Sequence, residues 1–198
     1  MTGARTRFAD LLVRARAALR PVILDGAVGT ELDDRGFEPA PGLWSGPAPL
    51  THPELLRAIH ADHVDAGAEV VVAATFRTTR RAFRGGGLPK KRWRDAVAAA
   101  VDVARDAAGD RALVAGGVAP LEDCWFPERA PSGAAARDEH ALLAGELAAA
   151  GVDLVWLETF GAAGELAAAA EAAARASDRG AIPFAASVTT RADGRLLD

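Results

Sequence analysis

Short apolar runs alternate along the chain with longer segments whose apolar residues recur at helical spacing. Each apolar run ends in glycine, proline or a polar residue, which predicts buried strands that meet turns. Most of the longer segments are followed by glycine, as helices often are. We expect strands at 21–24, 69–75, 111–118, 153–158 and 182–188, and helices at 53–66, 90–108, 138–150 and 164–176.

This alternation of strands and helices is typical of a parallel α/β fold. It fits both an open doubly wound sheet and a (β/α)8 barrel. The nucleotide-binding form of the open sheet carries G-x-G-x-x-G after its first strand, whereas residues 25–30 read DGAVGT, with a different glycine spacing. We interpret the three glycines at 85–87 as a flexible connector in a polar loop.

Composition narrows the class of protein. The chain has 198 residues and a net charge of -4, which argues against a general nucleic-acid binder. No apolar run approaches the roughly 20 residues of a membrane-spanning helix. Its one cysteine, Cys124, excludes an internal disulfide and a cysteine-cluster metal site built from this chain alone. We expect a cytoplasmic protein in which Cys124 is a buried small hydrophobe or a loop thiol.

The first 20 residues are rich in arginine, with apolar residues near helical spacing, as in a transit peptide. Asp10 interrupts this positive charge, and the segment runs directly into the first predicted strand. We therefore interpret residues 1–20 as a helix packed against the bottom of the fold, with its arginines in solvent.

Four ordered segments carry a family resemblance. Residues 23–32 read ILDGAVGTEL, with LWS at 43–45; residues 53–76 begin PELL and end AATF; residues 115–120 read AGGVAP; residues 147–160 read LAAAGVDLVWLETF. In this order and spacing they resemble the homocysteine S-methyltransferase family from about residue 21 to 198. The resemblance implies an incomplete domain of a zinc-dependent (β/α)8 barrel over residues 1–198, with the N-terminal helix at 1–20 and about five strands and four helices at 21–198.

The resemblance also implies a substrate site. In such barrels the working surface lies at the carboxyl ends of the strands, where Asp25 and Glu158 fall. Two acidic groups could hold the ammonium of homocysteine by charge-assisted hydrogen bonds. The family match implies that Asp25, Gly26 and Glu158 bind the amino acid. Gly26 suits this role because a residue without Cβ lets a substrate approach the backbone.

Other interpretations of these residues stay open. Asp25-Gly26 could form a simple turn, and Glu158-Thr159 could cap the following helix. His60 and His63 lie three residues apart on one helix, so a metal pair can be imagined. We place that helix outside the barrel and away from its mouth, which disfavours a metal role.

The resemblance implies transfer of a methyl group from a donor such as S-methylmethionine, S-adenosylmethionine or betaine to the homocysteine thiol, giving methionine. The family's zinc is held by cysteines after later strands, and Cys124 matches none of those positions. We therefore assign no catalytic residue and no metal ligand to this chain, and expect its enzyme activity to be incomplete or absent. Ala74 also stands where the family usually has Asn.

Two alternatives remain. The chain could be a non-catalytic amino-acid-binding or assembly half-barrel, and five parallel strands with open edges could pair with a second copy to form a homo-oligomer. A different (β/α) enzyme that uses only carboxylates, with aldolase- or isomerase-like activity, is disfavoured. No lysine is predicted at a strand end, where it could form a Schiff base.

Overall fold

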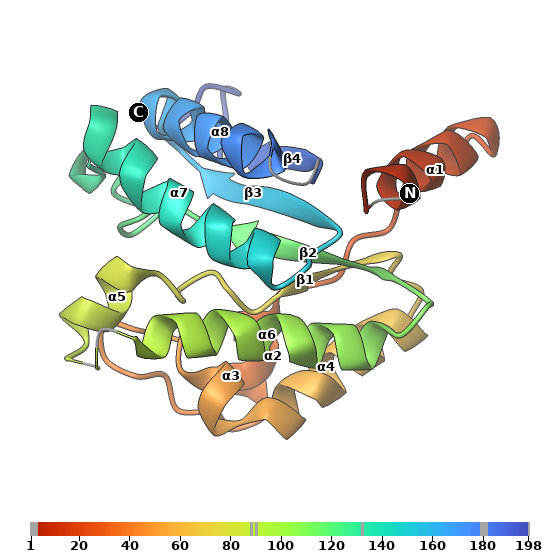
Figure 1. The fold of residues 1–198 in the computed structure, drawn as a ribbon, viewed down its shortest axis with the longest axis horizontal. Helices are drawn as coiled ribbons and strands as arrows, with labels where there is room; N and C mark the ends of the chain where they lie inside the picture. The colour runs from red at the N-terminus through yellow and green to blue at the C-terminus, as the bar shows by residue number, and fades with distance from the viewer. Residues whose placement is uncertain (1–3, 88, 90, 132, 179–181, 198) are drawn as a thin grey trace.

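The computed structural model describes residues 4–87, 89, 91–131, 133–178 and 182–197 (Figure 1). A four-stranded parallel sheet in the order β1-β2-β3-β4 forms its centre. The strands are β1 (Val70–Ala73), β2 (Leu113–Val118), β3 (Leu154–Phe160) and β4 (Phe184–Val188). The helices are α1 (Ala4–Ala17), α2 (Val28–Asp34), α3 (Ala48–Thr51), α4 (Pro53–Asp65), α5 (Arg80–Gly85), α6 (Arg92–Ala108), α7 (Gly133–Ala149) and α8 (Ala163–Asp178), with a 3-10 turn at Pro127–Arg129.

The strand order favours a barrel over a doubly wound sheet. Each strand lies beside the one that precedes it in the chain, so the order never reverses as it does in a doubly wound fold. The crossover helices α6, α7 and α8 share one core with the same face of the sheet, represented by Val71, Val114 and Val155. The sheet is thus an arc covered on its outside by helices.

The predicted strand at 21–24 is reduced to one bridge, between Leu24 and Val70. The segment does run parallel to β1, since Glu69 donates its N–H to Ile23 and Asp25 donates its N–H to Val70. Proline at position 21 has no N–H to give, and α2 begins at Val28, so the paired stretch is too short for a strand. The prediction of five strands is therefore wrong by this one element.

Short helices in the loops were not predicted. Helix α2 follows the Asp25 segment, α3 lies in the proline- and glycine-rich loop before α4, and α5 ends at Gly85, so the first of the three glycines at 85–87 is helical. The other predicted helices and strands are present with ends shifted by a few residues. The expected first residue of the helix at 90–108, Lys90, lies outside the described residues.

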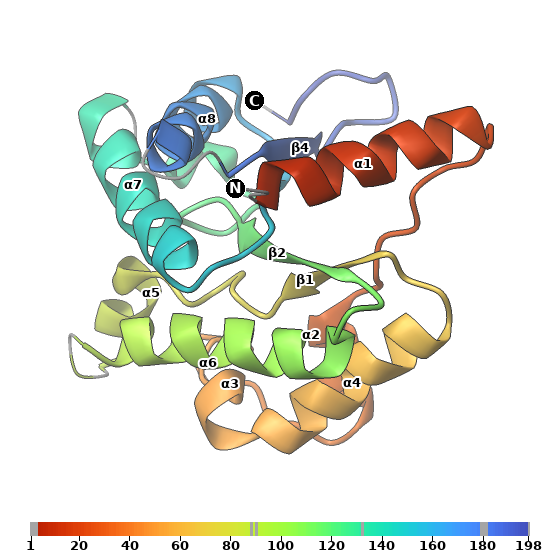
Figure 2. The same cartoon turned by 45° about the vertical axis from the view of Figure 1, so that its right-hand side comes forward.

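Helix α1 packs across the inner face of the sheet, opposite the face that α6 covers, as Figure 2 shows. Leu11 packs with Val70, Leu113 and Leu154 on that face. The buried carboxylate of Asp153 accepts hydrogen bonds from Arg7 of α1, from Arg105 of α6 and from the N–H of Val114. These three partners of Leu11 are the first residues of β1, β2 and β3, so α1 lies at the amino ends of the strands, where the sequence analysis expected it.

None of the described helices combines the length and the apolar character that crossing a membrane requires.

Candidate functional site

A cavity of about 330 Å³ opens at the carboxyl ends of the Leu24 segment, β1 and β3. Its volume suits a small metabolite. The cavity brings together Asp25, Gly26 and Glu158, the three residues that the sequence predicted for the site. The remaining lining residues are Leu24, Ala27, Val28, Gly29, Trp44, Ser45, Val72, Ala73, Ala74, Phe76 and Thr159.

Asp25 is fixed by β1 and not by a local turn. Its side chain is only 2% exposed, and Oδ2 accepts a hydrogen bond of 2.8 Å from the N–H of Val72. Burial raises the pKa of Asp25 to about 7, against the lowering effect of that hydrogen bond. Near neutral pH this carboxyl group therefore gains or loses its proton in response to a small change in its surroundings.

Gly26 lies where α4 comes close to the strand end. A Cβ at this position would sit 2.9 Å from Nε2 of His63, closer than real Cβ contacts. A side chain at this position would therefore displace the His63 ring, and glycine also leaves the backbone open to a ligand.

Glu158 is aimed into the cavity by an irregularity in β3. The register between β3 and β4 shifts between Leu157 and Phe160, and Thr159 has a positive φ of 60°, which is rare for a β-branched residue. The Glu158 carboxylate lies over Gly117 of β2, where a Cβ would be 2.5 Å from Oε1. Burial and the charge of Asp25 raise the pKa of Glu158 to about 7.

The alternative role of Glu158-Thr159 as a helix cap is wrong. Both residues belong to β3, and α8 begins only at Ala163. The acidic residue in the first turn of α8 is Glu165.

Trp44 and Phe76 form an aromatic wall of the cavity. Their rings meet edge to face, with centroids 5.8 Å apart. The Trp44 ring lies against Gly29, where any Cβ would collide with it, and Trp44 itself has a positive φ of 46°. Strained backbone of this kind concentrates at binding sites. The sequence analysis included both aromatics in the family motifs but gave them no role. The position of Phe76 just after β1 was an available signal, whereas Trp44 lies in the loop between α2 and α3.

The placement of His60 in the sequence analysis was wrong. Helix α4 does lie outside the sheet, but the His60 ring is fully buried and its Nδ1 lies 4.0 Å from Oδ2 of Asp25. His63, three residues further on, contacts Gly26. The two histidines therefore lie behind the lining residues Asp25 and Gly26, and neither lines the cavity itself.

The residues present do not form a zinc site. Over the described part of the chain, no group of three or more His, Cys, Asp or Glu side chains is arranged to hold a metal ion. Cys124 is a half-exposed thiol in the loop after β2, and burial together with Asp123 raises its pKa. A raised pKa disfavours the thiolate that zinc requires.

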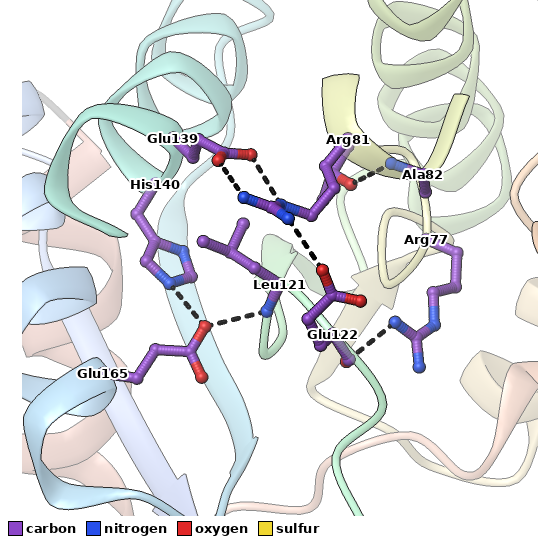
Figure 3. A network of polar contacts seen from close by, with 9 residues as sticks. Arg77, Arg81, Ala82, Leu121, Glu122, Glu139, His140 and Glu165 are labelled. Carbon is purple, nitrogen blue, oxygen red and sulfur yellow. Dashed lines mark hydrogen bonds and ion pairs between the residues drawn. The ribbon is translucent and has the colours of Figure 1, made fainter. Parts of the chain in front are cut away.

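A buried polar network anchors the loop between β2 and α7 (Figure 3). Oε1 of Glu165 accepts the N–H of Leu121 at 2.8 Å and lies 3.2 Å from Nε2 of His140. On the other side of the loop, Arg81 pairs with Glu122 and Glu139. Three helices, α5, α7 and α8, thus hold one loop in place.

We expect Glu165→Ala to lower the free energy of unfolding by about 2–4 kcal/mol, because it leaves the buried N–H of Leu121 and the His140 ring without their partner. Glu165→Gln keeps an oxygen at that position and should cost less than half as much. Urea denaturation of the two variants measures the difference. Equal losses would show that the hydrogen bonds of Glu165 contribute little.

The fold and the cavity together define the class of this protein. A parallel arc of strands with outer helices, whose ligand cavity lies at the carboxyl ends of the strands, is the arrangement of a (β/α) barrel domain that binds a small molecule. Residues 22–198 match the homocysteine S-methyltransferase family, and the chain belongs to this family of zinc-dependent transferases.

Individual relatives support this family assignment. Over 86 residues the chain is 36% identical to the homocysteine S-methyltransferase of Escherichia coli (strain K12), a stretch that covers 43% of this chain and 28% of that protein. Over 98 residues it is 38% identical to the S-methylmethionine–homocysteine S-methyltransferase BHMT2 of Pongo abelii, covering 49% of this chain and 25% of that protein. The matched stretches thus span about a quarter of these relatives.

The fold is shared with a solved relative. The crystal structure of the homocysteine methyltransferase MmuM from Escherichia coli in its metallated form superposes with a TM-score of 0.80 and 29% identity, over 93% of this chain and 69% of that chain. The predicted fold, a partial (β/α)8 barrel, is confirmed apart from the first strand.

Proposed function

We propose that this chain holds the amino-acid-binding part of a homocysteine S-methyltransferase, in which Asp25 and Glu158 bind the ammonium group of homocysteine. The observation that carries the proposal is the pair of buried carboxyl groups in one small cavity. The names of the matched relatives support homocysteine as the ligand.

The charge of the pair fits an ammonium ion. Burial raises both pKa values to about 7, and the charge of Asp25 makes ionisation of Glu158 harder still. Without a cation in the cavity, the pair therefore retains protons near neutral pH. A bound ammonium favours the ionised carboxylates, so we expect binding to release protons in this pH range.

The aromatic wall supports a cationic methyl donor. The Arg77 guanidinium already lies over the Phe76 ring, 5.3 Å from its centroid, so Trp44 is the ring of this wall that we propose attracts positive charge. A sulfonium or quaternary ammonium donor carries that charge next to the methyl group to be transferred. We propose that this side of the cavity receives the donor while the carboxylates hold the acceptor.

The described residues do not fit a zinc ion. We propose that residues 1–198 bind homocysteine and, by themselves, form no methionine. With Cys124 as its one cysteine, the chain fits the reducing cytoplasm, which we propose as its location.

Calorimetric titration with L-homocysteine, under a reductant and a metal chelator, tests the proposal. We expect binding to L-homocysteine and none to 4-mercaptobutyrate, which has the same thiol and carboxylate but no ammonium. Repeating the titration in buffers of different ionisation enthalpy measures the released protons. Equal binding of both ligands would contradict the role of the carboxylates. In a separate assay with added zinc and no chelator, methionine formation from S-methylmethionine would contradict the lack of activity.

We also propose that the sheet pairs with a further strand along β4. This strand has hydrogen-bonded neighbours on one side among the described residues, and Phe184 and Val188 are 41% and 47% exposed. Unpaired backbone and exposed apolar side chains favour association. Sedimentation velocity should show dimers or larger species at micromolar concentration, and replacing Val188 with Lys should shift them toward monomer; a stable wild-type monomer would contradict the proposal.

A further inference from the structure

His60 is a buried polar side chain without a hydrogen-bond partner. Within the described part of the chain, neither Nδ1 nor Nε2 of its ring has one, although the ring is 0% exposed. Leaving such groups unpaired costs free energy, so natural proteins rarely do it without a reason. The carboxyl group nearest to the ring is that of Asp25, whose Oδ2 lies 4.0 Å from Nδ1.

The polar groups that face Asp25 come from three elements. The N–H of Val72 in β1 already donates to Oδ2. Glu158 of β3 adds a like charge, which makes ionisation of the pair harder. From α4, His63 is directed at Gly26, and His60 is directed at the carboxylate itself. His60 is thus the side chain placed to give Asp25 a second N–H donor.

His60 is suited to donate as a neutral ring. Burial and the neighbouring His63 lower the pKa of His60 to about 4, so at neutral pH it carries one N–H and no charge. A neutral donor can stabilise a carboxylate without competing with a cationic ligand for it.

We propose that His60 is a positioning residue for Asp25: when this carboxyl group loses its proton, the ring donates Nδ1–H to Oδ2 and holds the carboxylate toward the cavity. The contact needs to shorten by about 1 Å to reach hydrogen-bond length. The proposal rests on the proposed function only for the identity of the ligand, because the interaction between His60 and Asp25 exists without one.

Nuclear magnetic resonance titration of the Asp25 side-chain carbon in the unliganded chain tests this proposal directly. Removing the donor with His60→Phe should raise the titration midpoint of Asp25 by about one pH unit, the effect of losing a hydrogen bond to a charged group. His60→Asn places an amide N–H near the position of Nδ1 and should restore most of the wild-type midpoint. His60→Gln places its amide near Nε2 and should not.

His140→Phe is the matched control, because His140 is also a buried histidine on a helix but pairs with Glu165 of α8 and not with Asp25. It should lower the melting temperature and leave the Asp25 midpoint unchanged. If the His60→Phe protein is too unstable to titrate, the contrast between Asn and Gln decides the question.

The pH dependence of L-homocysteine binding should move with Asp25. Binding strengthens as pH rises through the Asp25 midpoint, so in His60→Phe the profile should shift to higher pH, with about fivefold weaker binding at pH 7. An unchanged midpoint in both Phe and Gln variants, with only a lower melting temperature, would overturn the proposal. If the wild-type chain bound no homocysteine while the midpoint shifted as expected, the proposed function would fail and the role of His60 would stand.

Discussion

Replacing Asp25 with Asn should weaken L-homocysteine binding at pH 8 by roughly 100-fold, the largest loss we expect from any substitution in the cavity. The variant keeps the size of the side chain and removes its negative charge. Because Asp25 is almost fully buried, water cannot replace the lost partner of the ammonium. Truncating one member of a buried charge pair costs about 2–5 kcal/mol, and a factor of 100, about 2.8 kcal/mol, lies in the lower half of that range.

Two controls make the result specific. Glu146→Gln removes a carboxylate from α7 that pairs with Arg94 at the surface, and it should leave homocysteine binding unchanged. The Asp25→Asn chain should also discriminate less between L-homocysteine and 4-mercaptobutyrate, since one of the two carboxylates that bind the ammonium has been removed and Glu158 remains. A dissociation constant within threefold of the wild-type value in Asp25→Asn would exclude Asp25 from the binding site.

The parts of the fold that the sequence predicted are those controlled by long local patterns. The helix at 92–108 repeats buried alanine and valine at helical spacing, and the strand at 113–118 is buried throughout, so both are visible in the sequence. The segment at 21–24 failed as a strand because Pro21 has no N–H to donate and α2 begins at Val28, and a hydrophobic pattern alone does not show how short the paired stretch becomes. The short helices α2 and α3 have too few residues to show a period.

The residues of the site also fall into those that the sequence could locate and those that it could not. The sequence pattern placed Asp25 and Glu158 at strand ends, which meet at a common edge in a parallel sheet, and the family resemblance supplied their expected role in binding. The position of His60 could not, because it depends on how α4 rotates and how closely it packs against that edge. The bulge at Thr159 was equally hidden, since the sequence carries no glycine there to indicate a positive φ. Residues held by packing between distant segments are the ones that sequence patterns miss.

Replacing Glu158 with Gln should make the chain more stable at pH 8 while weakening its binding of homocysteine. Glu158 has a folded-state pKa of about 7, above the ordinary value of 4.5 that applies when the chain is unfolded. The folded chain therefore binds more protons than the unfolded chain between these values, and stability falls as pH rises through that window. Gln has no proton to lose, so its contribution does not depend on pH.

The expected result is a flatter stability profile. The wild-type free energy of unfolding, measured by urea denaturation, should decrease from pH 5 to pH 8, and Glu158→Gln should recover roughly 1–3 kcal/mol of that loss at pH 8 with little change at pH 4. Glu69→Gln is the opposite control, because the hydrogen bond from Arg20 lowers the pKa of Glu69. Losing this carboxylate should make the chain slightly less stable at pH 8. Equal profiles for wild type and Glu158→Gln would mean that Glu158 ionises freely in the fold. A gain in stability paired with a loss of binding would show that the carboxylate is kept in the cavity for its ligand, at the expense of the fold.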